Sequence, residues 1–241
     1  NNLSANYLLG NNIDATATAS WNGGAGFVPV GDATYAYRGD FDGLGYSING
    51  LTINRPNTDY IGLFGNSIGA QISNVGLTNA VIIGRNFVGG LDGSFRNGYI
   101  RESYVTGRVS GRGYAGGLVG QSEGSIEQSY ATADASGERS VGGLVGNSYG
   151  TITQSYATGS VNGAQYSGGL VGSNSGTINQ SYATGRVSDT PDSGALIGAN
   201  TKIDPFTDSY WNTETSGQTS AIGFGFSAAG STGLTTAQML Q

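Results

Sequence analysis

The sequence predicts an all-β protein, a right-handed parallel β-helix (β-solenoid) of about six coils, each of roughly 26 residues. Three observations predict it: a repeat of fixed period, a composition rich in Gly, Asn, Ser and Thr, and no long amphipathic helical segment. The right-handed sense follows by analogy and from the usual crossover between parallel strands.

The repeat is carried by two short blocks that recur in one register. The first block reads Gly-Gly-Leu-Val-Gly and starts at Gly116, Gly142 and Gly168, a step of 26 residues. The second block reads Ser-Tyr-Val/Ala-Thr and recurs at the same step from Ser103 onward. With looser copies on both sides, about six units cover residues 54–215, as in a stacked repeat protein.

Each unit is expected to form two or three short strands joined by Gly turns, because each Gly would cost a helix about 1 kcal/mol. One strand is Gly-Leu-Val, and another runs from Ile152 through Ser-Tyr-Ala-Thr to Val161. Side chains alternate along a strand, which places Val75, Leu77 and Val81 on an inner face. The Tyr and Thr of the second block then point outward.

The flanking segments do not follow the repeat. Residues 1–53 contain bulky side chains such as Trp21 and Phe27 and are expected to begin or cover the rod at its N-terminal end. Residues 216–241 are rich in Gly, Ser and Thr and are expected to form a closing strand or a linker. Such covering matters because an open strand edge invites aggregation.

Composition excludes several classes of function. The chain has no His and no Cys, so no Ser-His-Asp triad, Cys nucleophile or usual zinc, haem or iron–sulfur site is expected, and no cofactor is predicted. A net charge of −6 argues against a nucleic-acid partner. The sequence contains no apolar run of about 18 residues, so no transmembrane helix is predicted. The only Met is Met239, which predicts a segment of a larger protein.

The repeat blocks resemble the GLUG repeat, whose core reads Gly-Leu-apolar-Gly. Residues 40–53 resemble the segment that commonly precedes such repeats, and residues 210–217 resemble the family's usual ending. Two positions depart from the pattern, Asp92 in place of an apolar residue and Gly76 in place of Tyr.

The resemblance implies an extracellular β-helix from a large secreted bacterial adhesin of the filamentous-haemagglutinin type. Such adhesins are exported by two-partner secretion, so an outer-membrane transporter is an implied partner during secretion. GLUG repeats also resemble a segment of surface-anchored IgA-specific metallopeptidases that lies outside the catalytic centre. The resemblance brings no established binding residues.

The candidate ligand-binding residues form two neighbouring columns. They are predicted to be Tyr104, Tyr130, Tyr156, Tyr182 and Tyr210, with Thr106, Thr132, Thr158 and Thr184 beside them. Exposed aromatic side chains are typical of interfaces, but stacked identical side chains also simply stabilise neighbouring strands. The Thr column alone would fit a remote alternative, an ice-binding face.

Acidic residues supply the remaining candidates. Asp40 and Asp42 could ligate calcium, although Asp before Gly is also ordinary turn chemistry. Four further carboxylates near the last coil could serve a β-helix glycosidase or lyase, or simply occupy turns: Asp189, Asp192, Asp204 and Asp208.

The favoured function is therefore a non-catalytic segment of a secreted or cell-surface adhesin. Its expected partners are host or neighbouring cell-surface glycans or proteins, other copies of the chain, and neighbouring modules of a longer parent chain. One alternative is a passive spacer in a surface protein, including a surface peptidase. The other is a β-helix carbohydrate-active enzyme.

Overall fold

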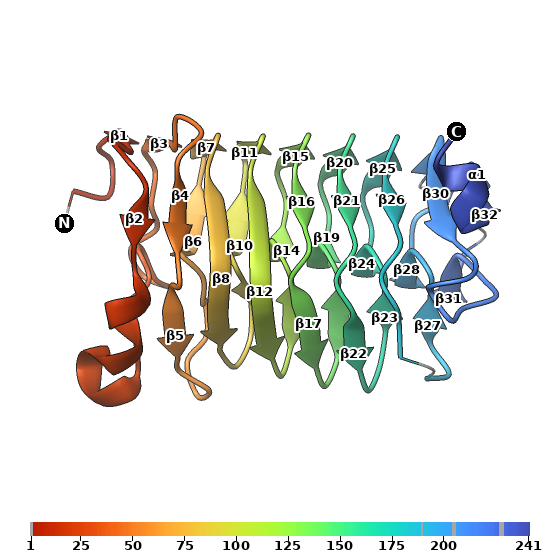
Figure 1. Ribbon diagram of the computed structural model, residues 1–241, viewed down its shortest axis with the longest axis horizontal. Helices are drawn as coiled ribbons and strands as arrows, with labels where there is room; N and C mark the ends of the chain where they lie inside the picture. Colours follow the sequence, from red (N-terminus) through yellow and green to blue (C-terminus); the bar gives the residue numbers. More distant parts are fainter. Residues whose placement is uncertain (1, 189, 204–205, 227–228) are drawn as a thin grey trace.

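The chain forms a rod of stacked turns, with its N-terminus at one end and its C-terminus at the other (Figure 1). This computed structural model describes residues 2–188, 190–203, 206–226 and 229–241. Strands of successive turns pair in parallel and form four sheets along the rod. The predicted parallel β-helix is confirmed.

Two sheets, A and C, are built from one short strand per turn. Sheet A contains β1 (Tyr7–Leu8), β3 (Asp40–Asp42), β7 (Gln71–Ser73), β11 (Tyr99–Arg101), β15 (Ser125–Glu127), β20 (Thr151–Thr153), β25 (Thr177–Asn179) and β29 (Phe206–Thr207). Sheet C contains β6 (Phe64–Ile68), β10 (Asp92–Arg96), β14 (Val119–Ser122), β19 (Val145–Ser148), β24 (Val171–Asn174), β28 (Ile197–Asn200) and β31 (Ile222–Gly225).

Sheet B is the largest sheet, and sheet D is the smallest. Sheet B contains β2 (Ile13–Asp14), β4 (Ser47–Asn49), β5 (Thr52–Asn54), β8 (Gly76–Ile83), β12 (Tyr104–Gly111), β16 (Tyr130–Ala131), β17 (Asp134–Gly137), β21 (Tyr156–Ala157), β22 (Val161–Gly163), β26 (Tyr182–Ala183), β30 (Ser209–Asn212) and β32 (Ser231–Leu234). Sheet D contains β9 (Val88–Gly89), β13 (Tyr114–Gly116), β18 (Ser140–Gly142), β23 (Ser167–Gly168) and β27 (Ser193–Gly194).

Each turn passes through sheets C, A, B and D in that order, as β14, β15, β16 with β17, and β18 do. In Figure 1 the near strands β8 and β12 run downward while the chain advances from left to right, so the coil is right-handed. Sheet C has seven strands, so the rod has about seven turns instead of the expected six. The seventh includes β31, which lacks the Gly-Leu-apolar-Gly block.

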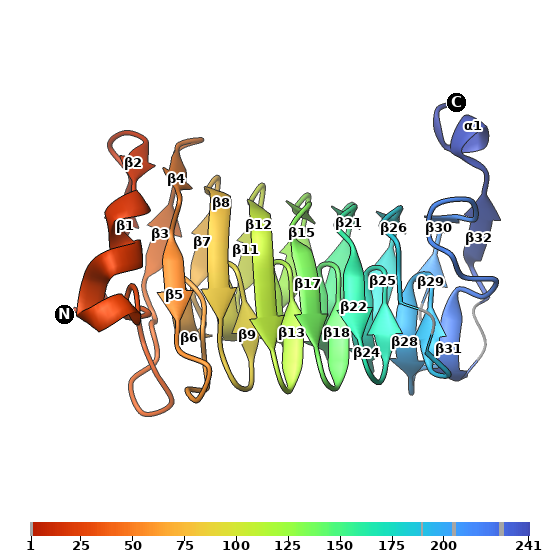
Figure 2. The same cartoon turned by 60° about the horizontal axis from the view of Figure 1, so that its bottom comes forward.

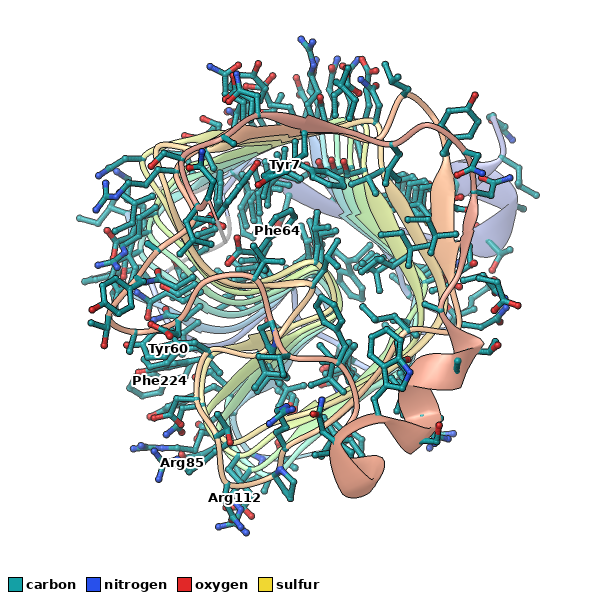
Figure 3. All side chains as sticks on the ribbon, turned by 90° about the vertical axis from the view of Figure 1, so that its left-hand side faces the viewer. Tyr7, Tyr60, Phe64, Arg85, Arg112 and Phe224 are labelled. Atoms are coloured by element: carbon teal, nitrogen blue, oxygen red, sulfur yellow. The ribbon has the colours of Figure 1, made fainter. Side chains whose placement is uncertain are left out.

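The N-terminal segment contributes strands to the same sheets. Strands β1 and β3 extend sheet A, and β2 and β4 extend sheet B. A 3-10 segment, η1 (Thr16–Gly24), packs beside β5. The exposed end carries Tyr7, Leu8 and Trp21 around an apolar hollow lined by Phe64 (Figure 3).

Among the described residues, no helix has the length and apolar character needed to cross a lipid bilayer.

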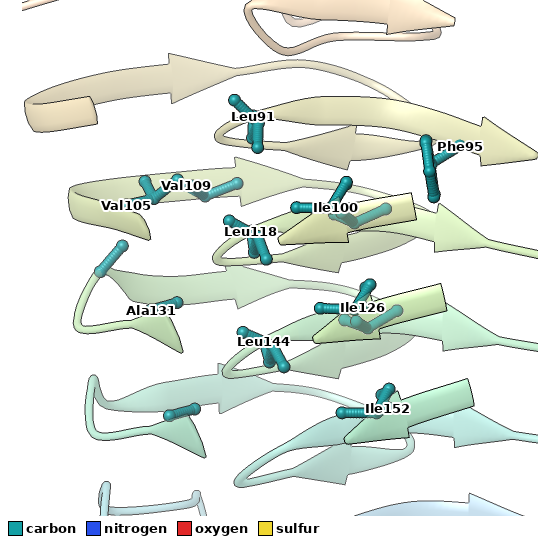
Figure 4. Close-up of a cluster of buried hydrophobic side chains, with 14 of the residues drawn as sticks. Leu91, Phe95, Ile100, Val105, Val109, Leu118, Ile126, Ala131, Leu144 and Ile152 are labelled. Carbon is teal, nitrogen blue, oxygen red and sulfur yellow. The ribbon is translucent and has the colours of Figure 1, made fainter. Parts of the chain in front are cut away.

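The core consists of aliphatic columns that run the length of the rod (Figure 4). One column from sheet A is Ile72, Ile100, Ile126, Ile152 and Ile178, and one from the Gly-Leu-apolar-Gly block is Leu63, Leu91, Leu118, Leu144, Leu170 and Leu196. A second, smaller core of Ala and Val lies between sheet D and the adjacent part of sheet B. Figure 2 shows the strands that enclose it, β13 and β18 of sheet D beside β17 and β22 of sheet B. Stability is therefore shared between neighbouring turns.

Glycine is required where sheets C and D touch. A Cβ at Gly146 in β19 would lie 2.7 Å from the Ala115 nitrogen and 2.9 Å from the Tyr114 carbonyl carbon in β13. Gly116 faces back toward β14 and β19, and a side chain there would overlap the Val119 carbonyl oxygen. The two strand layers thus approach to backbone contact, which explains the Gly residues at both ends of the first block.

A buried Ser column connects the turns at the corner between sheets A and B. Ser129 Oγ donates to the Glu127 carbonyl (2.8 Å) and accepts from the Ser103 N–H (3.2 Å). Ser155 and Ser181 repeat the same pair of bonds. Each Ser hydroxyl therefore hydrogen-bonds to a carbonyl of its own turn and to an N–H of the preceding turn. Either backbone group would be costly to bury without a partner.

The same corner corrects one strand prediction. The predicted strand from Ile152 to Val161 is broken, because Gln154 adopts a left-handed conformation with φ of 48° and turns the chain sharply. Gln128 and Gln180 do the same, with φ of 47° each. The sequence pattern missed this corner because alternation of buried and exposed residues continues on both sides of it.

The predicted inward position of Val81 is also wrong. Val81 is half-buried, and Ile82 is fully buried and pairs with Val109 of the next turn. The register between β8 and β12 shifts after Val105, where the earlier strand carries one extra residue. Asn79, with φ of 53°, lies in this bulge, and one extra residue inverts the faces of the residues that follow.

Replacing a contact glycine should destabilise the rod. In Gly143→Ala the added Cβ would overlap the Gly169 carbonyl of the next turn and lie 2.8 Å from Ala157 Cβ. We expect the free energy of unfolding to fall by about 1–3 kcal/mol, as for other overpacked cores. Urea unfolding followed by fluorescence measures it. Gly10→Ala is the control, since nothing lies within 4 Å of its Cβ position, and an equal loss in both would contradict the contact.

Removing one hydroxyl of the Ser column should also lower stability. Ser155→Ala leaves the Thr153 carbonyl and the Ser129 N–H without their partner, at an expected cost of about 1–3 kcal/mol in the free energy of unfolding. Thermal unfolding by circular dichroism measures the change. The exposed Ser160→Ala serves as the matched control, and an unchanged melting temperature for Ser155→Ala would refute the column's role.

Candidate ligand-binding surface

Four Tyr side chains form a stacked row on the outer face of sheet B, which we call the Tyr ladder: Tyr104, Tyr130, Tyr156 and Tyr182. Consecutive ring centroids lie 4.9, 4.8 and 4.8 Å apart, and the rings are within 3°, 2° and 5° of parallel. The spacing equals the distance between neighbouring strands of a sheet. The sequence repeat and the parallel register together align these rings.

The ladder has a defined beginning and end. At its start the Tyr104 ring occupies the space above Gly76, where any side chain would overlap the ring. The departure from Tyr at this position therefore leaves room for the first ring. At the other end Tyr210 pairs in register with Tyr182, but among the described rings the stack stops at Tyr182.

Stacking determines what the ladder offers to a partner. Each inner ring has a neighbour on both faces, so it presents its edge and its hydroxyl group. Rings at the strand spacing cover one another, so the inner rings display no open face. Burial, followed by the neighbouring phenols, raises the pKa of Tyr130 above its usual value, and Tyr156 and Tyr182 shift in the same direction, chiefly through burial. These three hydroxyls are therefore neutral donors at physiological pH.

The Thr column lies beside the Tyr ladder on the same face. Thr132 and Thr158 are exposed, whereas Thr106 and Thr184 are half-buried. Thr106 Oγ1 accepts a hydrogen bond from the Asn79 N–H at 3.0 Å. The middle of the column thus remains accessible next to the ring edges.

A second aromatic row, missed by the sequence analysis, lies at the entry to sheet D. Tyr60 stacks on Phe87 at 4.9 Å, and Phe87 lies 5.4 Å from Tyr114. Tyr166 and Phe224 continue on this side of the rod, with centroids 6.3 Å apart, and Figure 3 shows Tyr60 and Phe224 on the same side. The sequence does carry a signal for this row. In several units an aromatic residue lies three positions before the Gly that directly precedes Leu.

The two calcium candidates lie in β3 on either side of the core-facing Phe41. Asp42 accepts a hydrogen bond from the Leu44 N–H (2.8 Å), a local turn contact, and one from the side-chain amide of Asn74 (3.0 Å), which follows the paired strand β7. Within the described part of the chain, no three acidic residues gather where a metal ion could be held.

The four C-terminal carboxylates are not brought into one described cluster. Asp208 occupies the corner position equivalent to Gln180, with φ of 47°. Asp192 adjoins β27. Asp189 and Asp204 lie outside the described residues.

Asp92 is a buried carboxyl in an otherwise apolar column. It lies in register between Phe64 and Val119, is fully inaccessible, and has no hydrogen-bond partner for either oxygen among the described residues. Burial raises its pKa from 3.8 to about 7, because the nearby Ser67 hydroxyl, Ser94 N–H and Arg96 charge oppose this shift only in part. A side chain with these properties titrates near neutral pH.

The repeat geometry agrees with a known family motif. Residues 111–136, 137–162 and 163–188 match the GLUG motif. The three copies are consecutive, and each spans one turn of the rod from the end of one sheet-B segment to the next. The predicted GLUG repeat region is confirmed.

Two proteins share part of the sequence. Halomucin of Haloquadratum walsbyi is 42% identical over 123 residues, 48% of this chain and 1% of that protein. A protein of Evansella cellulosilytica, provisionally named a Gly-rich membrane protein, is 44% identical over 59 residues, 24% of this chain and 7% of that protein. The chain thus spans a small fraction of the length of both relatives.

One solved structure has the same fold. It is a protein of Bacteroides ovatus that carries the provisional name immunoglobulin A1 protease, with a TM-score of 0.75 and 22% identity. The match covers 97% of this chain and 78% of that chain. At this level of identity the likeness concerns the fold alone.

The buried carboxyl predicts pH-dependent stability. Between pH 4 and pH 7 the folded state holds a proton on Asp92 that the unfolded state has lost, so each rise in pH favours unfolding. The free energy of unfolding should fall by roughly 4 kcal/mol over this range and then level off. Asp92→Val, which restores the residue type of Val119, should remove the decline.

Urea unfolding at pH 4.5, 6 and 8 measures this dependence. Asp92→Asn is the control that removes the titration but keeps the polar group and its size. A decline that persists in both variants would assign the pH dependence to another residue.

Proposed function

We propose that this chain is a non-catalytic module of an extracellular adhesin and that the outer face of sheet B attaches its parent protein to cells, glycans or other copies. The Tyr ladder carries the proposal, because four half-buried rings and their hydroxyls form a continuous row beside accessible Thr side chains. Tyr side chains combine apolar area with a polar group and are enriched in binding interfaces.

The relatives support an extracellular or surface location. One bears the name Halomucin and the other a provisional name as a membrane protein. Because this chain matches 1% and 7% of their lengths, a module within a longer chain is the arrangement we propose, with adjoining modules as its immediate partners.

We also propose a filamentous-haemagglutinin-like parent, exported by two-partner secretion through an outer-membrane transporter. The consecutive GLUG copies support this proposal. The parallel rod supports it too, because a turn can fold on the turn before it as the chain emerges.

A passive spacer, including one in a surface peptidase, is the second candidate. It is favoured by the fold likeness to the Bacteroides ovatus protein, whose chain is covered to 78% by the match. A spacer needs the rod but not the Tyr ladder, so changes to the ladder separate the two functions.

The test replaces two inner rings of the ladder, Tyr130→Ser together with Tyr156→Ser. We expect binding to fall at least about tenfold, because an aromatic contact contributes on the order of 1 kcal/mol and two are lost. Binding of the whole chain is measured on a glycan array, on cultured cells and on immobilised copies of itself.

Tyr149→Ser is the matched control, because this Tyr is 53% exposed outside the ladder. Circular dichroism verifies that each variant remains folded. Unchanged binding by the double variant would favour the spacer, and failure of the unmodified chain to bind any of the three surfaces would refute adhesion.

A further inference from the structure

The Tyr ladder ends at a groove near the C-terminus, which we call the end groove. Its walls include Tyr182 and Tyr210 of sheet B, Leu234 of β32, and Gln238 and Met239 of the short helix α1 (Thr236–Met239). Figure 1 shows α1 beside β30 and β32 at this end of the rod.

The end groove contains a ring face that the ladder leaves open. Tyr156 covers one face of Tyr182 at 4.8 Å, whereas Tyr210 follows in register without stacking on the other face. Tyr210 is itself 37% exposed. At the end groove Tyr182 thus has one face that no other described ring covers, and Tyr210 lines the same groove.

The polar groups of the end groove are neutral. The Tyr182 and Tyr210 hydroxyls have no hydrogen-bond partner among the described residues, and Gln238 uses its Oε1 to accept from the Thr235 N–H. The Gln238 amide nitrogen and the Thr184 hydroxyl also lack a partner in the described structure. None of the lining residues is Asp, Glu, Lys or Arg, although the chain carries a net charge of −6.

We propose that the end groove is a binding site for a neutral sugar residue of a glycan. A pyranose ring has an apolar C–H face that packs on an aromatic ring, and a rim of hydroxyls that pair with neutral donors and acceptors. Aromatic walls with a few convergent polar groups are typical of small-ligand sites. An anionic ligand would find no opposite charge among the residues that line the groove. The Glu214 carboxylate, which accepts a hydrogen bond from the Thr236 N–H of the groove wall, would repel it. This inference rests on the proposed adhesive function and names its ligand class.

The experiment uses the whole chain and defined oligosaccharides. Cellohexaose, xylohexaose, mannohexaose and laminarihexaose are the neutral probes, and hexagalacturonate is the charged one, each titrated by calorimetry. We expect at least one neutral hexasaccharide to bind, and Tyr210→Ala to weaken it at least about tenfold. Tyr210→Phe, which keeps the ring and removes the hydroxyl, should retain most of the affinity of the unmodified chain.

Tyr149→Ala is the control for loss of an exposed Tyr elsewhere. If Tyr210→Ala leaves the affinity for neutral sugars unchanged, the end groove is not their binding site, although the proposed adhesive function still stands. Failure of all neutral probes, or tighter binding of hexagalacturonate, overturns the ligand class. If the chain also binds no cells, no arrayed glycans and no copies of itself, the proposed function fails as well.

Discussion

The fold depends on backbone contact between sheets C and D. Gly116 and Gly146 lie where a Cβ would overlap the facing strand, so these layers approach more closely than side chains allow. This contact folds each turn back on itself and directs Leu118 and its equivalents into the main core. The repeated Gly residues are therefore a steric requirement of the cross-section.

Because all central turns share the same cross-section, their strands pair in register and identical residues stack on one another. On the inner side of the sheet A to sheet B corner, Ser129 and its equivalents satisfy buried backbone groups of two turns. One residue later, on the outer side, Tyr130 and its equivalents stack at 4.8–4.9 Å. The Ser-Tyr pair thus joins the stability of the rod to the surface that we propose binds partners.

The sequence predicted the features that depend on period and alternation. The 26-residue step indicated the parallel turns, and alternation placed Val75 and Leu77 on the inner face, where both are buried. Features set by a single backbone conformation were not predictable, as the left-handed corner at Gln154 and the bulge at Asn79 demonstrate. The end groove was hidden for another reason, since β32 and α1 lack the repeat and their position against Tyr182 is a tertiary property.

The uniform step of the central turns bears on how such rods change in length. Gly116, Gly142 and Gly168 occupy equivalent points 26 residues apart, and each turn contacts chiefly its two neighbours. Genetic recombination between equivalent points of two turns would delete or duplicate one whole turn and leave every junction intact. Variation in length would then proceed in steps of one strand spacing, with one Tyr gained or lost at each step.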